Sequence, residues 1–403
     1  MKKLFSVLLS IMLVFALTFS ITACKKGSDE DLDENVDPVN FVIKTQTNDD
    51  DEITHTLTEF SLSAAAKKYV DDKDYEGLKE LFGRHKENTA DVTVLEDGLK
   101  ITIPEKVTHV ATNALANLGY LVELEVGNTV KEIKEGAFAG LSSLRSITLP
   151  FVGGELGGAN AKKLFGYVFG TVGGEGLTAI TQTYNNSNAE DATATATYQI
   201  PSSLETVVIT GDVKVDTVTK YYYINDEEEH VEVTVEEGNE APTEVDGNTV
   251  YSFVDKSYAN SAVQPYAFHN VTTIKEVVFA EGVTVEEIPD YAFYGCSAIK
   301  SLDVTAKVVG KYAYANCTAL RLLTLTGVEE IKEGAFSGCT TLGTGTSVAK
   351  NVLDLSALDF DKIGDDAFSG CTALKHVTVK ATLDDVNKER IFGADKELNA
   401  TVK

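Results

Sequence analysis

Residues 285–304 read VEEIPDYAFYGCSAIKSLDV, and the hydrophobic period of this stretch changes partway through. Apolar side chains first recur at steps of four, four and three, the spacing of one face of a helical turn, at Ile288, Ala292, Cys296 and Ile299. Leu302 and Val304 then alternate with polar residues, which is the two-residue period of a strand with one buried face. Because one turn and one short strand cannot enclose a core, the stretch predicts a unit that stacks on copies of itself.

Copies of this unit occur along much of the chain. Four preserve the pattern, and the first has Leu141 where the later ones have cysteine: residues 130–149, 308–325, 328–342 and 363–379. Two more copies, residues 107–126 and 263–279, are degenerate. Equivalent alanines lie 23 residues apart from Ala114 to Ala137, and then 25, 21, 22 and 32 residues apart from Ala267 to Ala367. The last interval is long because residues 343–351 are inserted ahead of a strand.

The pattern resembles the BspA-type leucine-rich repeat, whose consensus is roughly I-x-x-x-A-F-x-x-C-x-x-L-x-x-V-x-L. At least seven units match between about Leu99 and Val379. The resemblance implies an irregular α/β leucine-rich-repeat solenoid, with a short strand and a helical turn in each repeat, two inserted segments and an N-terminal cap. It also implies a non-catalytic protein of the cell surface that binds other molecules.

The charge of the chain is strongly acidic. It holds 35 basic and 62 acidic residues among 403, a formal net charge of −27. Nucleic-acid binding needs clustered Lys and Arg, so this balance argues against a nucleic-acid partner. It also disfavours adsorption to anionic lipid headgroups.

The N-terminus predicts export and a lipid anchor. Lys2 and Lys3 precede an apolar run, and residues 21–24, Ile-Thr-Ala-Cys, look like a bacterial lipobox. Residues 1–23 would then be a lipoprotein signal peptide, and the resemblance implies that Cys24 is diacylated; the alternative is a plain secretion signal. No later segment reaches the ~18 apolar residues of a membrane span, so the lipid would be the only membrane anchor, on the extracellular side of the bacterial cell membrane.

The mature chain divides into a tether, a capped solenoid and two insertions. Residues 24–40 are polar and acidic and predict a tether. In the N-terminal α/β cap region, residues 41–100, we expect one helix that begins at Ser61 or Ser63, runs to about Phe82 and is closed by Gly83. Residues 91–95 and 99–103 form either a hairpin or the first rungs of the solenoid. The solenoid covers residues 101–380, and residues 381–403 form a C-terminal cap.

Two insertions interrupt the repeats, near residues 151–199 and 213–260. The first is rich in Gly, Thr, Asn and Ala, and its segment FGYVFG resembles an elaborated coil of this repeat family. The second alternates as three strands separated by turns, which predicts a small β-excursion from the solenoid.

The sequence predicts no catalytic, metal or cofactor site. Cys296, Cys317, Cys339 and Cys371 occupy one equivalent repeat position, without C-x-x-C or a nearby His cluster, so we expect a row of free, buried thiols rather than zinc ligands. Disulfides are the alternative in an extracellular protein, but side chains that point in parallel bring sulfurs together poorly. The six histidines are scattered, and the acidic runs at 48–52 and 226–229 lack the alternating spacing of a calcium loop.

The strands provide the candidate binding surface. Residues between the inward aliphatic positions face outward, and they include no Lys or Arg from residue 123 onward. The candidate ligand-binding positions on this sheet face are Glu123, Glu125, Thr148, Glu276, Ser301, Asp303, Thr324, Asp354 and His376. The alternative is that these are merely the polar residues of any solvated sheet. Tyr221, Tyr222 and Tyr223 in the second insertion are a further candidate, and they would either bind a ligand or pack the excursion onto the solenoid.

The function that follows is binding of a protein or glycan partner at the cell surface, or adhesion, because extended solenoid sheets are a common binding platform. A structural cell-envelope protein without a dedicated ligand is the first alternative. A transport-associated substrate-binding lipoprotein or an enzyme is the second, and it would normally need two lobes around a cleft, for which the repeats leave little room.

Overall fold

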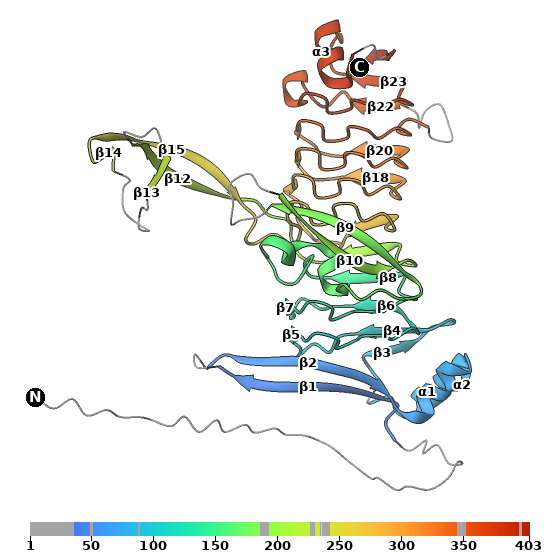
Figure 1. Ribbon diagram of the computed structural model, residues 1–403. Coiled ribbons are helices and arrows are strands. Elements are labelled where there is room, and N and C mark those ends of the chain that lie inside the picture. The colour runs from blue at the N-terminus through green and yellow to red at the C-terminus, as the bar shows by residue number, and fades with distance from the viewer. Residues whose placement is uncertain are drawn as a thin grey trace, which may run out of the picture.

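A computed structural model describes residues 36–48, 51–87, 89–185, 193–225, 230–233, 235, 242–344, 352–394 and 397–403. The expected signal peptide, Cys24 and most of the expected tether lie outside these residues. The predicted solenoid is confirmed: short strands stack rung upon rung along one axis, with an antiparallel sheet projecting from its side (Figure 1). No helix among the residues described is long and apolar enough to cross a bilayer.

Each turn of the solenoid is called a coil here. Most coils contribute one strand to a long ladder of parallel strands. Its first part is one six-stranded sheet of β3 (Val92–Val94), β4 (Leu99–Thr102), β6 (Leu121–Glu125), β8 (Ser146–Leu149), β11 (Thr206–Ile209) and β16 (Glu276–Phe279). Its later parts are β18 (Ser301–Val304) with β20 (Leu322–Leu325), then β22 (Val352–Leu355), β23 (His376–Val379) and β24 (Asn399–Val402). The expected hairpin is also the first rung, since β4 pairs antiparallel with β3 and parallel with β6.

A second, shorter ladder runs along another side of the coils. Its strands have two residues each and pair in parallel: β5 (His109–Val110) with β7 (Glu132–Ile133), and β17 (Glu287–Ile288) with β19 (Val308–Val309) and β21 (Glu330–Ile331). Each coil is therefore held to its neighbours at two places, which fixes the rotation from one rung to the next.

The segment between the two ladders is a run of turns rather than the expected helical turn. Tyr291, Phe293 and Gly295 donate their backbone N–H groups to carbonyls of the following coil. The N–H groups between them donate three residues back within their own coil. The left-handed backbone at Tyr291 and Gly295, with φ of 58° and 72°, prevents a continuous helix because an α-helix needs negative φ throughout.

The core is organised by a ladder of stacked aromatic rings. Phe293 lies 5.0 Å from both Phe268 and Tyr314 between ring centroids, with planes 9° and 5° apart. The stack continues from Tyr314 to Phe336 at 5.5 Å and to Phe368 at 5.3 Å. All these rings are buried, which confirms the equivalence of the A-F positions that the sequence predicts.

The N-terminal region packs on the first coils. β1 (Val39–Thr47) and β2 (Ile53–Leu62) form an antiparallel pair, and β2 joins β5. Ser63, not Ser61, caps α1 (Ala64–Asp71), accepting the N–H of Ala66 at 3.2 Å.

The expectation of a single helix in this region is wrong. The backbone turns left-handed at Lys73, with φ of 56°, and Asp74 starts a second helix, α2 (Tyr75–Arg84), by accepting the N–H of Gly77 at 2.9 Å. An Asx cap competes with helix continuation, so the chain breaks where two aspartates flank Lys73. Gly83 lies inside α2 rather than closing it.

The middle of the first interruption packs into the core of the solenoid. It contains two 3-10 helices, η1 (Asn160–Lys163) and η2 (Phe165–Phe169), and a hairpin of β9 (Leu177–Asn185) and β10 (Thr193–Pro201). The Phe165 and Phe268 rings lie 5.0 Å apart between centroids and are tilted by 32°, and Phe138 donates its N–H to the Val168 carbonyl. The FGYVFG segment is thus a coil of the solenoid, as the sequence predicts.

The second interruption forms a separate antiparallel sheet that extends away from the stack (Figure 1). Its strands are β12 (Asp216–Ile224), β13 (His230–Val233), β14 (Glu244–Val245) and β15 (Asn248–Ser257), in the order β13-β12-β15-β14. Asp246 and Gly247 link β14 to β15 with φ of 51° and 82°, the positive values that a tight hairpin turn requires.

The far end of the solenoid carries η4 (Phe360–Lys362) and α3 (Asp385–Phe392). Asp384 caps α3 by accepting the N–H of Asn387 at 2.7 Å. Phe392 stacks 5.7 Å from Phe368, so the last helix covers the end of the aromatic ladder.

Candidate functional site

The candidate positions on the sheet face lie in straight columns. Glu123 is in register with Ser146, Ser146 with Thr206, and Thr206 with Glu276. On later rungs Asp303 pairs with Thr324 and Asp354 with Thr378. Glu276, Ser301, Asp303, Thr324, Asp354 and His376 are exposed, and Glu123, Glu125 and Thr148 are half-buried. The structure therefore brings these side chains to one side of the stack and turns their aliphatic neighbours inward.

The predicted outward positions include no Lys or Arg, but the inference that no basic residue offsets their acidic side chains is wrong for two of them. Lys100, one rung before the predicted series, lies 2.7 Å from Glu125 between Nζ and Oε2. Lys403, one rung after it, lies 3.1 Å from Asp354 between Nζ and Oδ2. Lys100 stands on β4, ahead of the copy at residues 107–126, and Lys403 directly follows β24, after the copy at residues 363–379, so the predicted outward positions did not include them. The remaining acidic surplus belongs to Glu123, Glu276 and Asp303.

A row of basic residues that sequence reasoning missed borders this face. The residue directly before each long-ladder strand is exposed and basic in five coils: Arg145, Lys275, Lys300, Arg321 and Lys375. Arg145 is paired with Asp97 and Lys275 with Glu205. The signal was present in the sequence as a Lys or Arg one position ahead of the alternating pattern. We call these five residues the basic margin.

A half-exposed ladder of tyrosines lies on the turn side of three adjacent coils. Tyr266 stacks on Tyr291 with ring centroids 4.7 Å apart and planes 7° apart, and Tyr291 stacks on Tyr312 at 5.2 Å and 17°. Tyr312 ends against Gly334, where a Cβ atom would come within 2.2 Å of its ring. A second pair, His269 and Tyr294, stacks beside it at 4.8 Å. We call Tyr266, Tyr291 and Tyr312 the tyrosine ladder.

All three tyrosines of this ladder have left-handed backbone, with φ of 67°, 58° and 51°. Equivalent positions in other coils hold Asn113, Gly136, Gly334 and Asp366, residue types that tolerate positive φ. A bulky side chain there costs about 1–2 kcal/mol. The signal that could have shown this is the change from EGAF to PYAF, DYAF and KYAY in the sequence.

The cysteine row is confirmed as four free, buried thiols. Each sulfur donates to a backbone carbonyl of the preceding coil; Cys296 reaches the Phe268 oxygen at 3.2 Å, and Cys339 reaches the Tyr314 oxygen at 3.3 Å. Burial raises the pKa of the Cys296 thiol to about 12, so this thiol stays protonated at neutral pH. Among the residues described, no group of three or more His, Cys, Asp or Glu side chains is placed to hold a metal ion.

The repeat units themselves match a known family. The model of the BspA type leucine rich repeat region matches in six copies, over residues 97–156, 252–357 and 351–398, which together span just over half of the chain. The chain belongs to the BspA-type leucine-rich repeat family. The unmatched part between residues 156 and 252 holds both hairpin β9–β10 and most of the projecting sheet.

Solved structures similar to this BspA-type protein include two leucine-rich repeat proteins. A leucine-rich repeat protein of T. pallidum shares 14% identity at a TM-score of 0.29, over 89% of this chain and 97% of that one. One from Eubacterium ventriosum shares 15% at 0.23, over 84% and 82%. The pneumococcal vaccine antigen PcpA shares 14% at 0.21, over 85% and 82%. No curated protein matches the chain.

The insertion tyrosines of this BspA-type protein lie on β12, the inner strand between β13 and β15. Tyr222 faces Tyr251 on β15, and the two rings stack 5.7 Å apart. Tyr221 and Tyr223 point to the opposite face of the same strand and are half-buried. The acidic run at residues 226–229 and the lipid-attachment candidate Cys24 lie outside the described residues.

Proposed function

We propose that this chain is a non-catalytic, lipid-anchored protein of the bacterial cell surface that binds a protein or glycan partner on its sheet face. The observation that supports binding is the register of the long ladder, which holds polar side chains at fixed spacing over successive rungs. A surface of this kind is preorganised, because each outward side chain stands on a strand that is hydrogen-bonded to at least one neighbouring strand.

The charges on this face indicate which charges a partner would carry. Glu276 on β16 and Asp303 on β18 are exposed acidic residues of this face, and Lys300 and Arg321 of the basic margin directly precede β18 and β20. A complementary partner carries basic groups opposite the two acidic residues and acidic groups opposite the margin. The net charge of −27 favours encounter with basic partners at long range, and added salt weakens that effect beyond a Debye length of about 8–10 Å.

The test is direct binding of the purified full-length chain to arrays of matrix proteins, glycans and bacterial cell surfaces. Charge reversal of Glu276 and Asp303 together should weaken the captured interaction, and so should reversal of Lys300 and Arg321. The matched control reverses Glu329 and Glu389, two exposed carboxylates away from this face. Equal binding by all variants, or loss in the control alone, would remove the sheet face as the binding surface.

The anchor is tested separately. Replacing Cys24 with Ala should move the protein from the detergent-soluble membrane fraction to the medium, because the lipid attached at this residue is the proposed anchor. Membrane retention that is unchanged by this substitution contradicts lipid anchoring, whatever the sheet face binds.

A further inference from the structure

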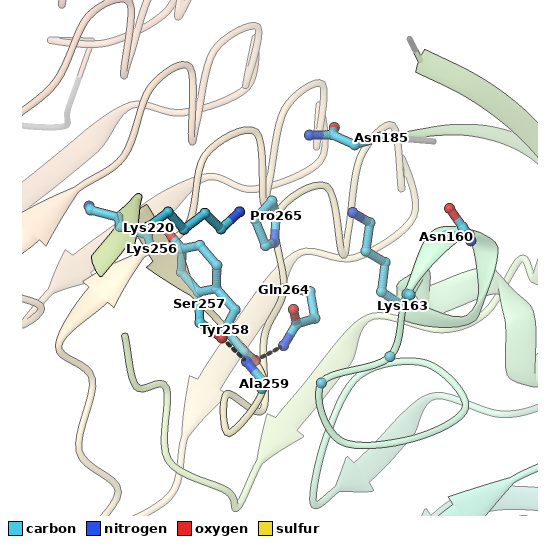
Figure 2. A pocket seen from close by; sticks show the side chains of 13 residues that line it. Asn160, Lys163, Asn185, Lys220, Lys256, Ser257, Tyr258, Ala259, Gln264 and Pro265 are labelled. Atoms are coloured by element: carbon cyan, nitrogen blue, oxygen red, sulfur yellow. Dashed lines mark hydrogen bonds between the residues drawn. The ribbon is translucent and has the colours of Figure 1, made fainter. Parts of the chain in front are cut away.

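A pocket of about 560 Å³ opens where the two interruptions of the solenoid meet (Figure 2). The loop at residues 157–160 and η1 form one wall, and the base of the β12–β15 sheet forms another. Gly157 brings the two together: its φ is +67°, and a Cβ atom there would come within 2.1 Å of the Ala259 carbonyl oxygen. Segments far apart in the sequence thus enclose one site, on the scale of a small-molecule pocket.

The lining of this pocket is positive, in contrast to the rest of the chain. Its thirteen described residues include Lys163, Lys220 and Lys256 and neither Asp nor Glu. In a chain with 62 acidic and 35 basic residues, this is a local reversal of the overall charge. A concave site lined by cations and by no carboxylate favours an anionic ligand.

Lys163 is the most constrained of these cations. Its side chain is only 8% exposed, and no carboxylate or hydrogen-bond partner of its amino group occurs in the described part of the chain. Its Nζ lies 5.8 Å from the centre of the Tyr266 ring, the first ring of the tyrosine ladder. Burial lowers the pKa of Lys163 to about 8, since water is removed without a compensating negative charge. A ligand anion would supply that charge.

Lys256 lines the same pocket but has a structural role, which makes it a useful comparison with Lys163. Its amino group is paired with Glu287, which is itself 4% exposed and also accepts Lys332 at 3.0 Å. Tyr258 adds its hydroxyl to Glu287 at 3.3 Å. This network fixes the base of the projecting sheet to the coils. The neighbouring cation with an internal counterion has a structural role, and Lys163 has no such counterion.

We propose that this pocket binds the carboxylate of an acidic sugar, with Lys163 as its anchoring cation. The other lining groups fit a sugar better than a bare ion: Asn160, Asn185 and Ser257 can bond hydroxyls, and Tyr258 and Pro265 offer apolar surface. One N–H group of the Gln264 amide donates to the Tyr258 carbonyl (Figure 2) and the other to the Ser261 carbonyl, so the amide oxygen is the atom left to accept from a ligand. The site is separate from the sheet face.

The test measures binding of D-glucuronate and N-acetylneuraminate to the purified full-length chain by calorimetry, with N-acetylglucosamine and sulfate as probes of the neutral sugar and the bare anion. We expect the two acidic sugars to bind and the other two probes to bind much more weakly. Lys163→Met should weaken acidic-sugar binding about 10- to 100-fold, the effect of losing a charge-assisted hydrogen bond. The substitution should leave the melting temperature unchanged or raised, because an apolar side chain suits the buried position better.

The matched control is Lys162→Met, which removes the adjacent lysine that is exposed and paired with Glu155. It should bind acidic sugars as the parent chain does, and so should the variant reversed at Glu276 and Asp303. No binding of either acidic sugar overturns the proposal, and equal binding of N-acetylglucosamine or sulfate overturns its assignment to an acidic sugar. Full binding by a folded Lys163→Met variant would place the site elsewhere.

Discussion

The same coils carry two aromatic ladders that differ in almost every physical respect. Phe268, Phe293 and Tyr314 stack in the core, fully buried. Tyr266, Tyr291 and Tyr312 stack two residues earlier in each coil, half-exposed and with left-handed backbone. The inner ladder stabilises the fold by burying apolar area. In the outer ladder, the stabilisation from ring contacts is opposed by the cost of the left-handed backbone.

In the outer ladder, the free-energy cost of the left-handed backbone and the gain from ring stacking nearly cancel. Positive φ at Tyr291 costs about 1–2 kcal/mol. Stacking on Tyr266 and Tyr312 contributes about 0.5–1.5 kcal/mol for each ring pair. Glycine at the same position, as in Gly136 and Gly334, avoids the strain. Tyrosine in three consecutive coils is therefore not required for stacking the solenoid, which fits its place beside Lys163 at the proposed pocket.

The largest effect should come from the inner ladder. Phe336→Ala removes a fully buried ring between Tyr314 and Phe368, and it should cost about 3–5 kcal/mol. Because coils contact mainly their neighbours, the loss should appear as local melting around residues 313–368. Thermal unfolding combined with limited proteolysis measures it. A variant with unaltered unfolding and cleavage would contradict the importance of the inner stack.

The inner ladder could be predicted from the spacing of the repeats, and the outer ladder could not be predicted from that spacing. The Ala-Phe pair recurs with the repeat, and burial at a fixed place in each coil follows from that spacing. The tyrosines recur with the same spacing, but spacing does not reveal that their backbone is left-handed or that their rings stack. Both depend on the inter-coil hydrogen bonds, such as that from the Tyr291 N–H to the Lys311 carbonyl.

The same limit applies to the candidate sites. The outward columns of the sheet follow from alternation, so Glu276 and Asp303 could be placed on one face before the structure was known. Lys163 could not be placed, because it lies in a glycine-rich interruption without a period. Its environment arises only when η1 meets the end of β15, a long-range contact that no local pattern encodes. Lys100 and Lys403 were missed because the outward positions were read from residue 123 to residue 378 only, and these two lysines lie before and after them.

An intermediate effect should separate strain from stacking in the outer ladder. Tyr291→Ala keeps a side chain at φ of 58° and loses both ring contacts, so it should destabilise by about 1–3 kcal/mol. Tyr291→Gly loses the same contacts but relieves the strain, so it should lie within about 1 kcal/mol of the parent chain. Chemical denaturation of the pair measures the difference. Equal stability of the two variants would mean that the left-handed backbone carries no cost here.

The smallest effect concerns the hydroxyl at the end of the outer ladder. Tyr312 donates to Glu333 Oε1 at 2.8 Å, and Lys311 lies 3.3 Å from the other carboxylate oxygen. This hydrogen bond, followed by the one from Lys311, lowers the pKa of Glu333 below its ordinary 4.5. Tyr312→Phe keeps the ring and removes the hydroxyl, so it should cost less than about 1 kcal/mol at neutral pH.

The Tyr312→Phe substitution should have a clearer effect on the pH dependence of stability. A carboxylate whose pKa is lower in the folded state stabilises the fold above its unfolded pKa, and that contribution is lost as pH falls through the folded value. In Tyr312→Phe the pKa of Glu333 should rise toward 4.5, so the variant should lose less stability on acidification than the parent chain. Lys311→Met is the control that touches the same carboxylate but not the ladder. If NMR titration finds the pKa of Glu333 lowered equally in the parent and in Tyr312→Phe, the hydroxyl of the outer ladder is not what holds that charge.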